Sequence, residues 1–178
     1  MGVSLGPDGI VGVGSSVTNI IVLSRSHRKW TNSNHAGGFD SWRDATNGSH
    51  GHNKRSVSST LAITAHLAGG AAFANGSGNN YGYLDARLKI TAPNGNVFYS
   101  GTSRCWWRND TMTGVNEWIQ VIPLEYISAG AAVQQTGSFT ILPQYYYNRS
   151  VGSAMTAAGI NTWGTGSMIQ VIEMDNQV

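Results

Sequence analysis

This sequence of 178 residues has little charge, only four prolines and a single cysteine. Charged residues make up 11% of it, whereas ordinary globular domains carry about 25%. Because Cys105 has no second cysteine to pair with, the chain is not a small secreted scaffold held together by disulfides. No apolar run approaches the ~20 residues that a membrane helix needs. We therefore expect no membrane partner.

Glycine and aromatic residues, in contrast, are plentiful: there are 23 Gly, six Trp, seven Tyr and four Phe. Low charge and many glycines disfavour long solvated helices and favour short strands joined by turns. The aromatic side chains supply enough apolar area that the chain is not expected to be disordered. The net charge of +2 is too small to indicate nucleic-acid binding, so we expect no nucleic-acid partner.

Alternating apolar and polar residues predict half-buried strands in the middle of the chain. The odd-numbered positions of 60–67 and the even-numbered positions of 83–90 are apolar. The outward-facing residues of the second strand are then Tyr83, Asp85, Arg87 and Lys89. Asn94-Gly95 predicts a hairpin turn after it.

Two later strands carry an internal proline, and the last strand is among the most apolar. Pro123 restricts its strand to an edge or a bulge, because proline cannot donate a ladder hydrogen bond. In the closing stretch 167–174 apolar residues occupy both faces, which predicts a central strand with a neighbour on each side. For Glu173, inside that stretch, we expect either a position in solvent or an ion pair with a cation such as Arg104 across an interface.

The sequence thus predicts eight or nine evenly spaced strands and no helix, which is typical of an antiparallel jelly-roll β-sandwich. We divide the chain into residues 1–16 and a jelly-roll domain at 17–178. The first segment is rich in glycine and lacks the features of a signal peptide, so we expect an extended anchoring arm. Its apolar contacts are expected to come from Val3, Leu5, Ile10, Val11 and Val13.

Residues 27–55 form a long polar stretch that holds three aromatic residues, Trp30, Phe39 and Trp42. A loop of this length is functional or contains short strands of its own. Three interpretations of the aromatic residues are open: stacking on sugar rings of a host glycan, anchoring a neighbouring protein subunit, or capping the open end of the sandwich.

Residues for catalysis or metal binding are sparse. The three Glu and six Asp include no pair spaced for acid–base work, and no nucleophile or phosphate-binding motif is present. Cys105 fits an inert core residue better than a nucleophile. His50 and His52 alternate along one segment and form a weak candidate metal site, near His35 and Asp40 or Asp44. We expect no catalytic activity, no cofactor and no resident metal.

The order of "STLAITAHLAGG", "NNYGYLDARLKI", "EWIQVIPLEYI" and "SFTILPQYYYN", closed by "TWGTGSMIQVIEM", resembles a family of small jelly-roll virion proteins of tailed bacteriophages. Such proteins are common in phages of aquatic bacteria, and their domains are similar to the trimeric tumour-necrosis-factor and complement-type jelly rolls. The resemblance covers about residues 17–174. It implies a homotrimer on a virion surface, assembled in the host cytoplasm.

Aromatic residues compatible with a trimer or partner interface are Trp118, Tyr145, Tyr146 and Tyr147. Two functions follow as hypotheses. The first is a capsid decoration (cement) protein whose N-terminal arm clamps the major capsid protein. The second is a receptor-binding tip or short tail-fibre adhesin, which attaches to a tail adaptor protein and recognises host glycan through loops 27–55 and 69–80.

Overall fold

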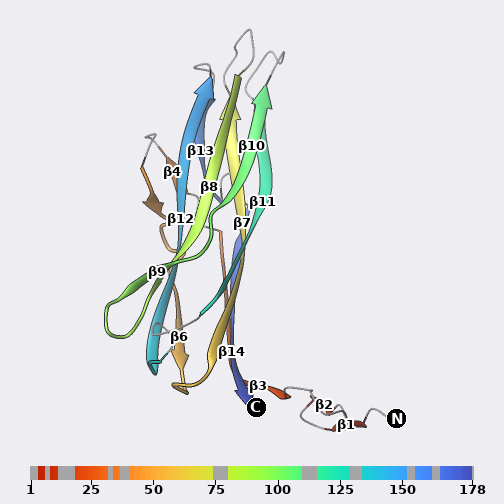
Figure 1. Ribbon diagram of the computed structural model, residues 1–178. Helices are drawn as coiled ribbons and strands as arrows, with labels where there is room; N and C mark the ends of the chain where they lie inside the picture. The colour runs from red at the N-terminus through yellow and green to blue at the C-terminus, as the bar shows by residue number, and fades with distance from the viewer. Residues whose placement is uncertain are drawn as a thin grey trace.

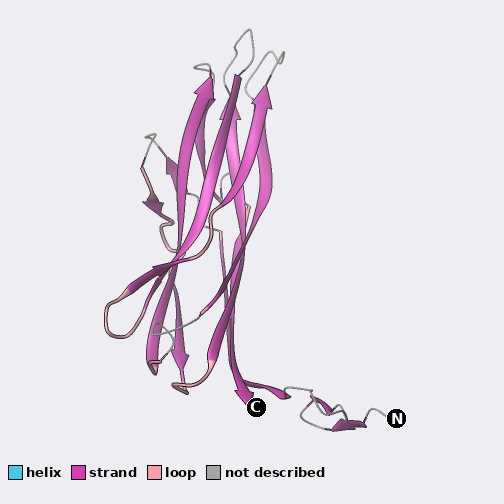
Figure 2. Cartoon of the chain, viewed as in Figure 1, coloured by secondary structure: helices cyan, strands magenta, loops and turns pink. Residues whose placement is uncertain are grey.

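The computed structural model describes residues 4–6, 9–11, 19–31, 34–36, 41–73, 80–109, 116–128, 134–151, 155–161 and 165–177. Within these residues the regular structure is entirely β, and no helix long and apolar enough to cross a membrane is found in them (Figures 1 and 2). The strands are β1 (Ser4–Gly6), β2 (Gly9–Val11), β3 (Asn19–Trp30), β4 (Asn34–Ala36), β5 (Arg43–Asp44), β6 (His50–Lys54), β7 (Thr60–Phe73), β8 (Asn80–Thr91), β9 (Val97–Tyr99), β10 (Ser103–Asn109), β11 (Asn116–Ile127), β12 (Gly137–Val151), β13 (Met155–Ile160) and β14 (Ser167–Gln177).

Two antiparallel sheets form the body of the molecule. The β7 sheet contains β3, β4, β7, β11, β13 and β14, and the β8 sheet contains β5, β6, β8, β9, β10 and β12. Each sheet is about four strands wide, because short strands follow one another along the same neighbour: β14 and β13 both pair with β7, and β6 and β5 both pair with β12.

The strand order is that of a jelly roll. The long strands run β3–β14–β7–β11 in one sheet and β6–β12–β8–β10 in the other, so the chain crosses repeatedly between the sheets. The last strand, β14, lies between β3 and β7. The predicted fold and the predicted central position of the closing strand are both confirmed.

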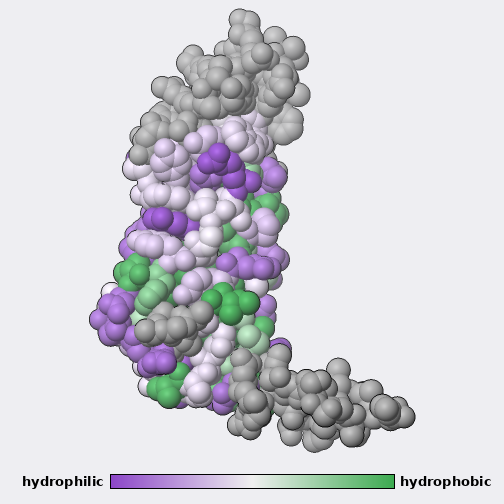
Figure 3. Space-filling model, viewed as in Figure 1, coloured by the Kyte–Doolittle hydropathy of each residue, from purple (hydrophilic) through white to green (hydrophobic). Residues whose placement is uncertain are grey.

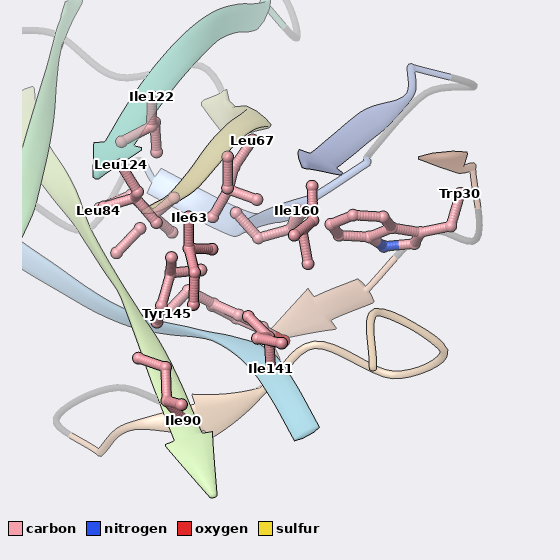
Figure 4. Packing of buried hydrophobic residues seen from close by; sticks show 14 of the residues in the cluster. Trp30, Ile63, Leu67, Leu84, Ile90, Ile122, Leu124, Ile141, Tyr145 and Ile160 are labelled. Atoms are coloured by element: carbon pink, nitrogen blue, oxygen red, sulfur yellow. The ribbon is translucent and has the colours of Figure 1, made fainter. Parts of the chain in front are cut away.

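Most apolar side chains lie between the sheets. On the side seen in Figure 1, hydrophobic residues form separate spots among hydrophilic and pale residues (Figure 3). The predicted alternation of β8 is confirmed, because Leu84, Ala86, Leu88 and Ile90 are at most 1% exposed. In the core, Ile63 and Leu67 of β7 lie close to Ile141 and Tyr145 of β12 (Figure 4). Burying each such aliphatic side chain stabilises the fold by about 1.5–3 kcal/mol.

Turns and prolines occupy the positions that their chemistry allows. The predicted Asn94-Gly95 turn joins β8 to β9; Gly95 has a φ of 86°, and its N–H donates to the Ala92 carbonyl over 2.9 Å. Pro123 lies on β11, which pairs with β7 alone among the described strands, as predicted for an edge. Pro143 lies on β12 between the segments that pair with β6 and with β5. The backbone N–H that proline lacks is therefore not needed for either pairing.

The polar stretch 27–55 is more structured than a loop. β3 continues to Trp30 because β14 offers it a partner along its whole length, from Gln177 opposite Asn19 to Ser167 opposite Trp30. β4, β5 and β6 follow within the same stretch. The predicted long loop is therefore wrong over its two ends, although short strands inside it were expected.

The N-terminal segment contains a hairpin. β1 and β2 form a two-stranded sheet of their own, with Leu5 opposite Ile10 and Val11 opposite Ser4. Figure 1 shows this hairpin outside the sandwich, on the side where the C-terminus lies. Val3 and Val13, also expected in the anchoring arm, lie outside the described residues. The anchoring role of the segment stays a prediction.

Candidate functional site

Aromatic and cationic side chains cover the outer face of the β8 sheet. The alternation of β8 directs Tyr83, Asp85 and Arg87 outward, as the sequence predicted, and β10 places Trp106 opposite Tyr83 and Arg104 opposite Asp85. The layer is completed by residues of β9 and β12 and by Trp42, which directly precedes β5. We call this layer the aromatic ladder; its members are Trp42, Tyr83, Arg87, Tyr99, Arg104, Trp106 and Tyr146.

At one end of the ladder, Arg104 is neutralised by Asp85. Its Nε and Nη2 donate to the two carboxylate oxygens over 2.6 and 2.7 Å, and this hydrogen bonding raises the pKa of Arg104. The guanidinium lies over Tyr83 at 3.7 Å and near Trp106 at 5.4 Å from the ring centroids. Trp106 is 54% exposed. This end is a stacked, internally paired surface.

At the other end, Arg87 lies between two rings and is differently paired. Its guanidinium carbon is 4.0 Å from the ring centroid of Trp42 and 4.0 Å from that of Tyr99. Its Nε donates to Gln144 Oε1 over 2.9 Å, and Gln144 Nε2 donates to Asp44 over 2.6 Å. No carboxylate of the described residues forms a salt bridge with Arg87. As far as the described residues go, the guanidinium is therefore held by two rings and an amide and not by a carboxylate.

A second polar group is buried at the edge where β3 approaches β6. The Glu173 side chain is fully buried and accepts hydrogen bonds from the hydroxyls of Ser24 (2.7 Å) and Ser59 (2.6 Å). It also accepts from the backbone N–H groups of Arg55 (2.8 Å) and Ser56 (3.0 Å). Both expectations for Glu173 are wrong: it is neither in solvent nor paired with Arg104, because four donors compensate its burial.

The protonation state of this group follows from its contacts. Burial alone raises the pKa of Glu173, but the hydrogen bonds from Ser59, Ser24 and the two backbone N–H groups outweigh it and lower that pKa. Glu173 is therefore a carboxylate at neutral pH. Its hydrogen bonds connect residues 55–59 to β14, and this role is structural.

The two histidines of β6 join the same buried network. As the alternation predicted, both rings point the same way, and the Ser26 hydroxyl lies 2.8 Å from His50 Nε2 and 2.8 Å from His52 Nδ1. His52 Nε2 is 3.9 Å from the Glu173 carboxylate. Burial is the main cause that lowers the pKa of each histidine, so both are neutral at pH 7. We name these residues the buried polar cluster: Ser24, Ser26, His50, His52, Lys54, Ser59 and Glu173.

The candidate metal ligands do not assemble around the histidines in the part of the chain that the structure describes. Asp44 instead faces Gln144 and lies 3.9 Å from Lys89. Asp40 and the side chain of His35 lie outside the described residues. Within the described ranges, no group of three His, Cys, Asp or Glu side chains is placed to hold a metal ion.

Several other predicted residues are core residues. Trp30 is 5% exposed and lies beside Ile160 (Figure 4), so contact with a glycan or a neighbouring subunit is wrong for it. Tyr145 and Tyr147 are 3% and 1% exposed, so the expected interface position is wrong for these two, and Tyr146 alone of the three tyrosines points outward. Cys105 is buried, and burial raises the pKa of its thiol to about 12.

The remaining predicted residues have mixed outcomes. Trp42 belongs to the aromatic ladder and packs at 5.7 Å from Tyr146. Trp118 lies on β11 opposite Ala71, and Phe39 lies outside the described residues. Sequence reasoning found the outward residues of β8 but not their partners Trp42 and Tyr99, because these come from separate segments that only the assembled sheet brings together.

No protein-family model and no curated protein matches the sequence. Among solved structures, the chain is similar to the infectious bursal disease virus VP2 subviral particle, with a TM-score of 0.47 and 12% identity over 94% of this chain and 41% of that chain. It is also similar to the T=1 particles derived from infectious bursal virus, with a TM-score of 0.47 and 10% identity over 100% of this chain and 41% of that chain. The chain thus spans less than half the length of either protein.

Proposed function

We propose that this chain is a structural protein of a bacteriophage virion, a homotrimer that decorates the outer surface of the capsid. The jelly-roll topology agrees with the resemblance to small phage virion proteins. Fold alone supports many functions, so the proposal depends on a surface. The observation that carries it is the set of exposed apolar side chains on the outer face of the β7 sheet. In this proposal the N-terminal arm attaches the trimer to the major capsid protein.

That face exposes apolar side chains among its polar ones, whereas the water-facing side of an antiparallel sheet is ordinarily polar. On the edge strand β11, Val121 is 60% exposed and Ile127 is 69% exposed. On the central strand β14, Met168, Ile172 and Met174 are only partly buried and alternate with the buried inward residues. Exposed apolar side chains on one sheet face, with polar residues between them, suit contact with another protein. A neighbouring subunit would remove these side chains from water.

Charge on the same face supports a second copy as the neighbour. One row of cross-strand partners runs from His27 on β3 through Gln170 and Thr64 to Glu125 on β11. Arg25 and Lys29 flank His27 on the same side of β3, so one edge is basic and the opposite edge carries Glu125. Complementary edges suit a head-to-tail contact, which closes into a ring when the rotation allows it.

The oligomer is tested by light scattering after size-exclusion chromatography. We expect the mass of a trimer for the unchanged protein and of a monomer for the double variant Val121→Asp, Ile127→Asp. The control, Thr140→Asp, adds a charge to an exposed position on the β8 sheet and should remain trimeric. A monomeric unchanged protein, or a double variant that stays trimeric, contradicts the use of this face.

The virion location is tested by copy number. Quantitative mass spectrometry of purified virions should find this chain at a count comparable to that of the major capsid protein. A chain absent from virions overturns the proposal. A count many times smaller indicates the tail and supports the second candidate, a receptor-binding tip or short tail-fibre adhesin that recognises host glycan and attaches to a tail adaptor.

The second candidate is favoured by the aromatic ladder, which exposes Trp106 and Tyr99 and includes Trp42 from the polar stretch first suggested for glycan contact. Both candidates are non-enzymatic. Cys105 is buried with a raised thiol pKa, and the Glu173 and Asp85 carboxylates are engaged in hydrogen bonds.

A further inference from the structure

We propose that Arg87, together with Trp42 and Tyr99, binds the carboxylate of a uronic acid residue in an acidic polysaccharide. The inference concerns the purified chain and does not depend on where the protein lies in a virion. It starts from a difference between the two arginines of the aromatic ladder. Arg104 has a carboxylate counterion in Asp85, at 2.6 and 2.7 Å, whereas Arg87 has an amide partner instead.

The amide partner leaves the outer part of the guanidinium for a ligand. Gln144 Oε1 accepts from Nε of Arg87, and Gln144 is itself held by Asp44. The two Nη groups have no hydrogen-bond partner among the described residues. They form a planar pair of donors, which matches the two oxygens of a carboxylate. Because the guanidinium is already fixed between rings and amide, little side-chain entropy is lost when an anion binds.

The two rings add recognition of a sugar. The guanidinium of Arg87 lies over one face of each ring, and Tyr99 is 47% exposed, so part of its ring remains open to a ligand. The C–H faces of a pyranose ring are apolar and pack on such rings, while the carboxylate at the edge of a uronic acid reaches the cation between them. A simple anion would use only the arginine, so the rings favour a carboxylated sugar over phosphate or sulfate.

The length of the ladder favours a polymer over a single sugar. Tyr83 and Arg87 are four residues apart on β8, which is ~13 Å along a strand. Tyr83 and Trp106, with ring centroids 5.0 Å apart, form a second stacking surface at that distance. Arg104 there is already neutralised by Asp85, so this second surface suits an uncharged part of the chain. The ligand is thus an extended polysaccharide that carries uronic acid residues.

The test is isothermal titration calorimetry of the full chain with oligogalacturonate and with its carboxyl-reduced derivative, which is the same sugar chain without charge. We expect binding of the first and at least tenfold weaker binding of the second. Dextran sulfate is the probe for binding to any polyanion. Equal affinity for dextran sulfate and oligogalacturonate, or no affinity for oligogalacturonate, overturns the proposal.

Substitutions distinguish binding at this site from attraction of a polyanion to the overall charge of the protein. Arg87→Gln and Arg55→Gln remove the same charge, the second from an exposed position in the connection after β6. We expect at least a tenfold loss for Arg87→Gln and less than a twofold loss for Arg55→Gln. Arg87→Lys keeps the charge without the planar pair of donors and should also lose affinity. Equal losses for Arg87→Gln and Arg55→Gln contradict the proposal.

A further variant tests whether binding can be weakened while the protein stays folded. Tyr99 is half exposed at the end of the ladder, so Tyr99→Ala should keep the thermal unfolding midpoint within a few degrees while weakening oligogalacturonate binding several-fold. Unchanged binding in a folded Tyr99→Ala protein removes the sugar-stacking part of the site and overturns the assignment to a carboxylated sugar.

Discussion

The interior of the sandwich consists of two chemically different parts. Between β7, β8 and β12 the core is apolar, and Leu84, Leu88 and Ile141 are fully buried. At the edge where β3 approaches β6, the buried polar cluster occupies the same kind of enclosed position, with Glu173 equally inaccessible. The first part is stabilised by the removal of apolar area from water, and the second by hydrogen bonds to a buried carboxylate.

This difference indicates which parts of the fold tolerate amino-acid substitution. An apolar core loses stability in proportion to the atoms removed, because neighbouring side chains relax into part of the space. For a buried carboxylate with four donors, the loss of stability does not scale with the number of atoms removed. Removing this one acceptor leaves several buried donors without partners. Substitutions in the polar cluster should therefore be more damaging than their size suggests.

The largest effect is expected from Glu173→Gln, which keeps the shape but replaces one acceptor oxygen with an NH₂ group facing donors. We expect the free energy of unfolding to fall by about 3–5 kcal/mol, as for a broken buried charged pair. Urea denaturation followed by tryptophan fluorescence measures this. Glu125→Gln is the control, because Glu125 is exposed on β11 and its change should cost less than about 0.5 kcal/mol. Similar costs for both would show that the carboxylate network is dispensable.

Leu84→Ala probes the apolar part. Leu84 is fully buried between the sheets, so the free energy of unfolding should fall by about 3 kcal/mol through lost burial and a residual cavity. The same denaturation experiment applies, with Val121→Ala as the control on the exposed face. A smaller loss for Leu84→Ala than for Val121→Ala would reverse the assignment of inner and outer faces.

As the pH falls, the contribution of the buried polar cluster to stability should decrease before that of the apolar core. The pKa values of His50 and His52 lie below 6.5 in the fold, mainly through burial, so the unfolded chain binds protons first as the pH falls below 6.5. This destabilises the fold progressively until the pH reaches the lowered folded values. Glu173 also has a lowered pKa, so its stabilisation is complete above the ordinary pKa of a glutamate and is lost progressively as the pH falls from there through its folded value.

Thermal unfolding midpoints between pH 8 and pH 4 test the order of these steps. The double variant His50→Gln, His52→Gln should lose the decline that begins near pH 6.5 and keep the steeper one at lower pH. If the double variant retains the first decline unchanged, a group other than these histidines is responsible.

Ser24→Ala should have the smallest effect of the series. The hydroxyl donates to Glu173 over 2.7 Å and lies 3.1 Å from His52 Nε2, but three other donors to the carboxylate remain. We expect a loss of about 1 kcal/mol in the free energy of unfolding. A loss as large as that of Glu173→Gln would mean that Ser24, rather than the backbone donors, holds the carboxylate.

Much of the architecture could be predicted from the sequence, because strand alternation is a local property. The alternation of 83–90, the turn at Asn94-Gly95 and the edge position of Pro123 each depend on a few neighbouring residues, and each is confirmed. The central position of β14 could also be predicted, since a strand with apolar residues on both faces needs a neighbour on each side.

The candidate sites could be predicted only in part. The outward direction of Arg87 and the shared direction of His50 and His52 follow from a period of two, and both are found. The burial of Trp30 could not be predicted, because its polar neighbours do not show that pairing with β14 extends β3 to this residue and encloses the ring.

By itself, then, the sequence determined that the fold is all β, which face of the strands at 60–67 and 83–90 turns inward, and that the closing strand is central. Only the tertiary structure decided which distant residues become partners. Glu173 finds Ser24 and Ser59, and Arg87 finds Trp42 and Tyr99, across separations that no local pattern encodes. The reason is physical: periodicity acts between neighbours along one strand, while hydrogen bonds and stacking act between strands that the crossing connections bring together.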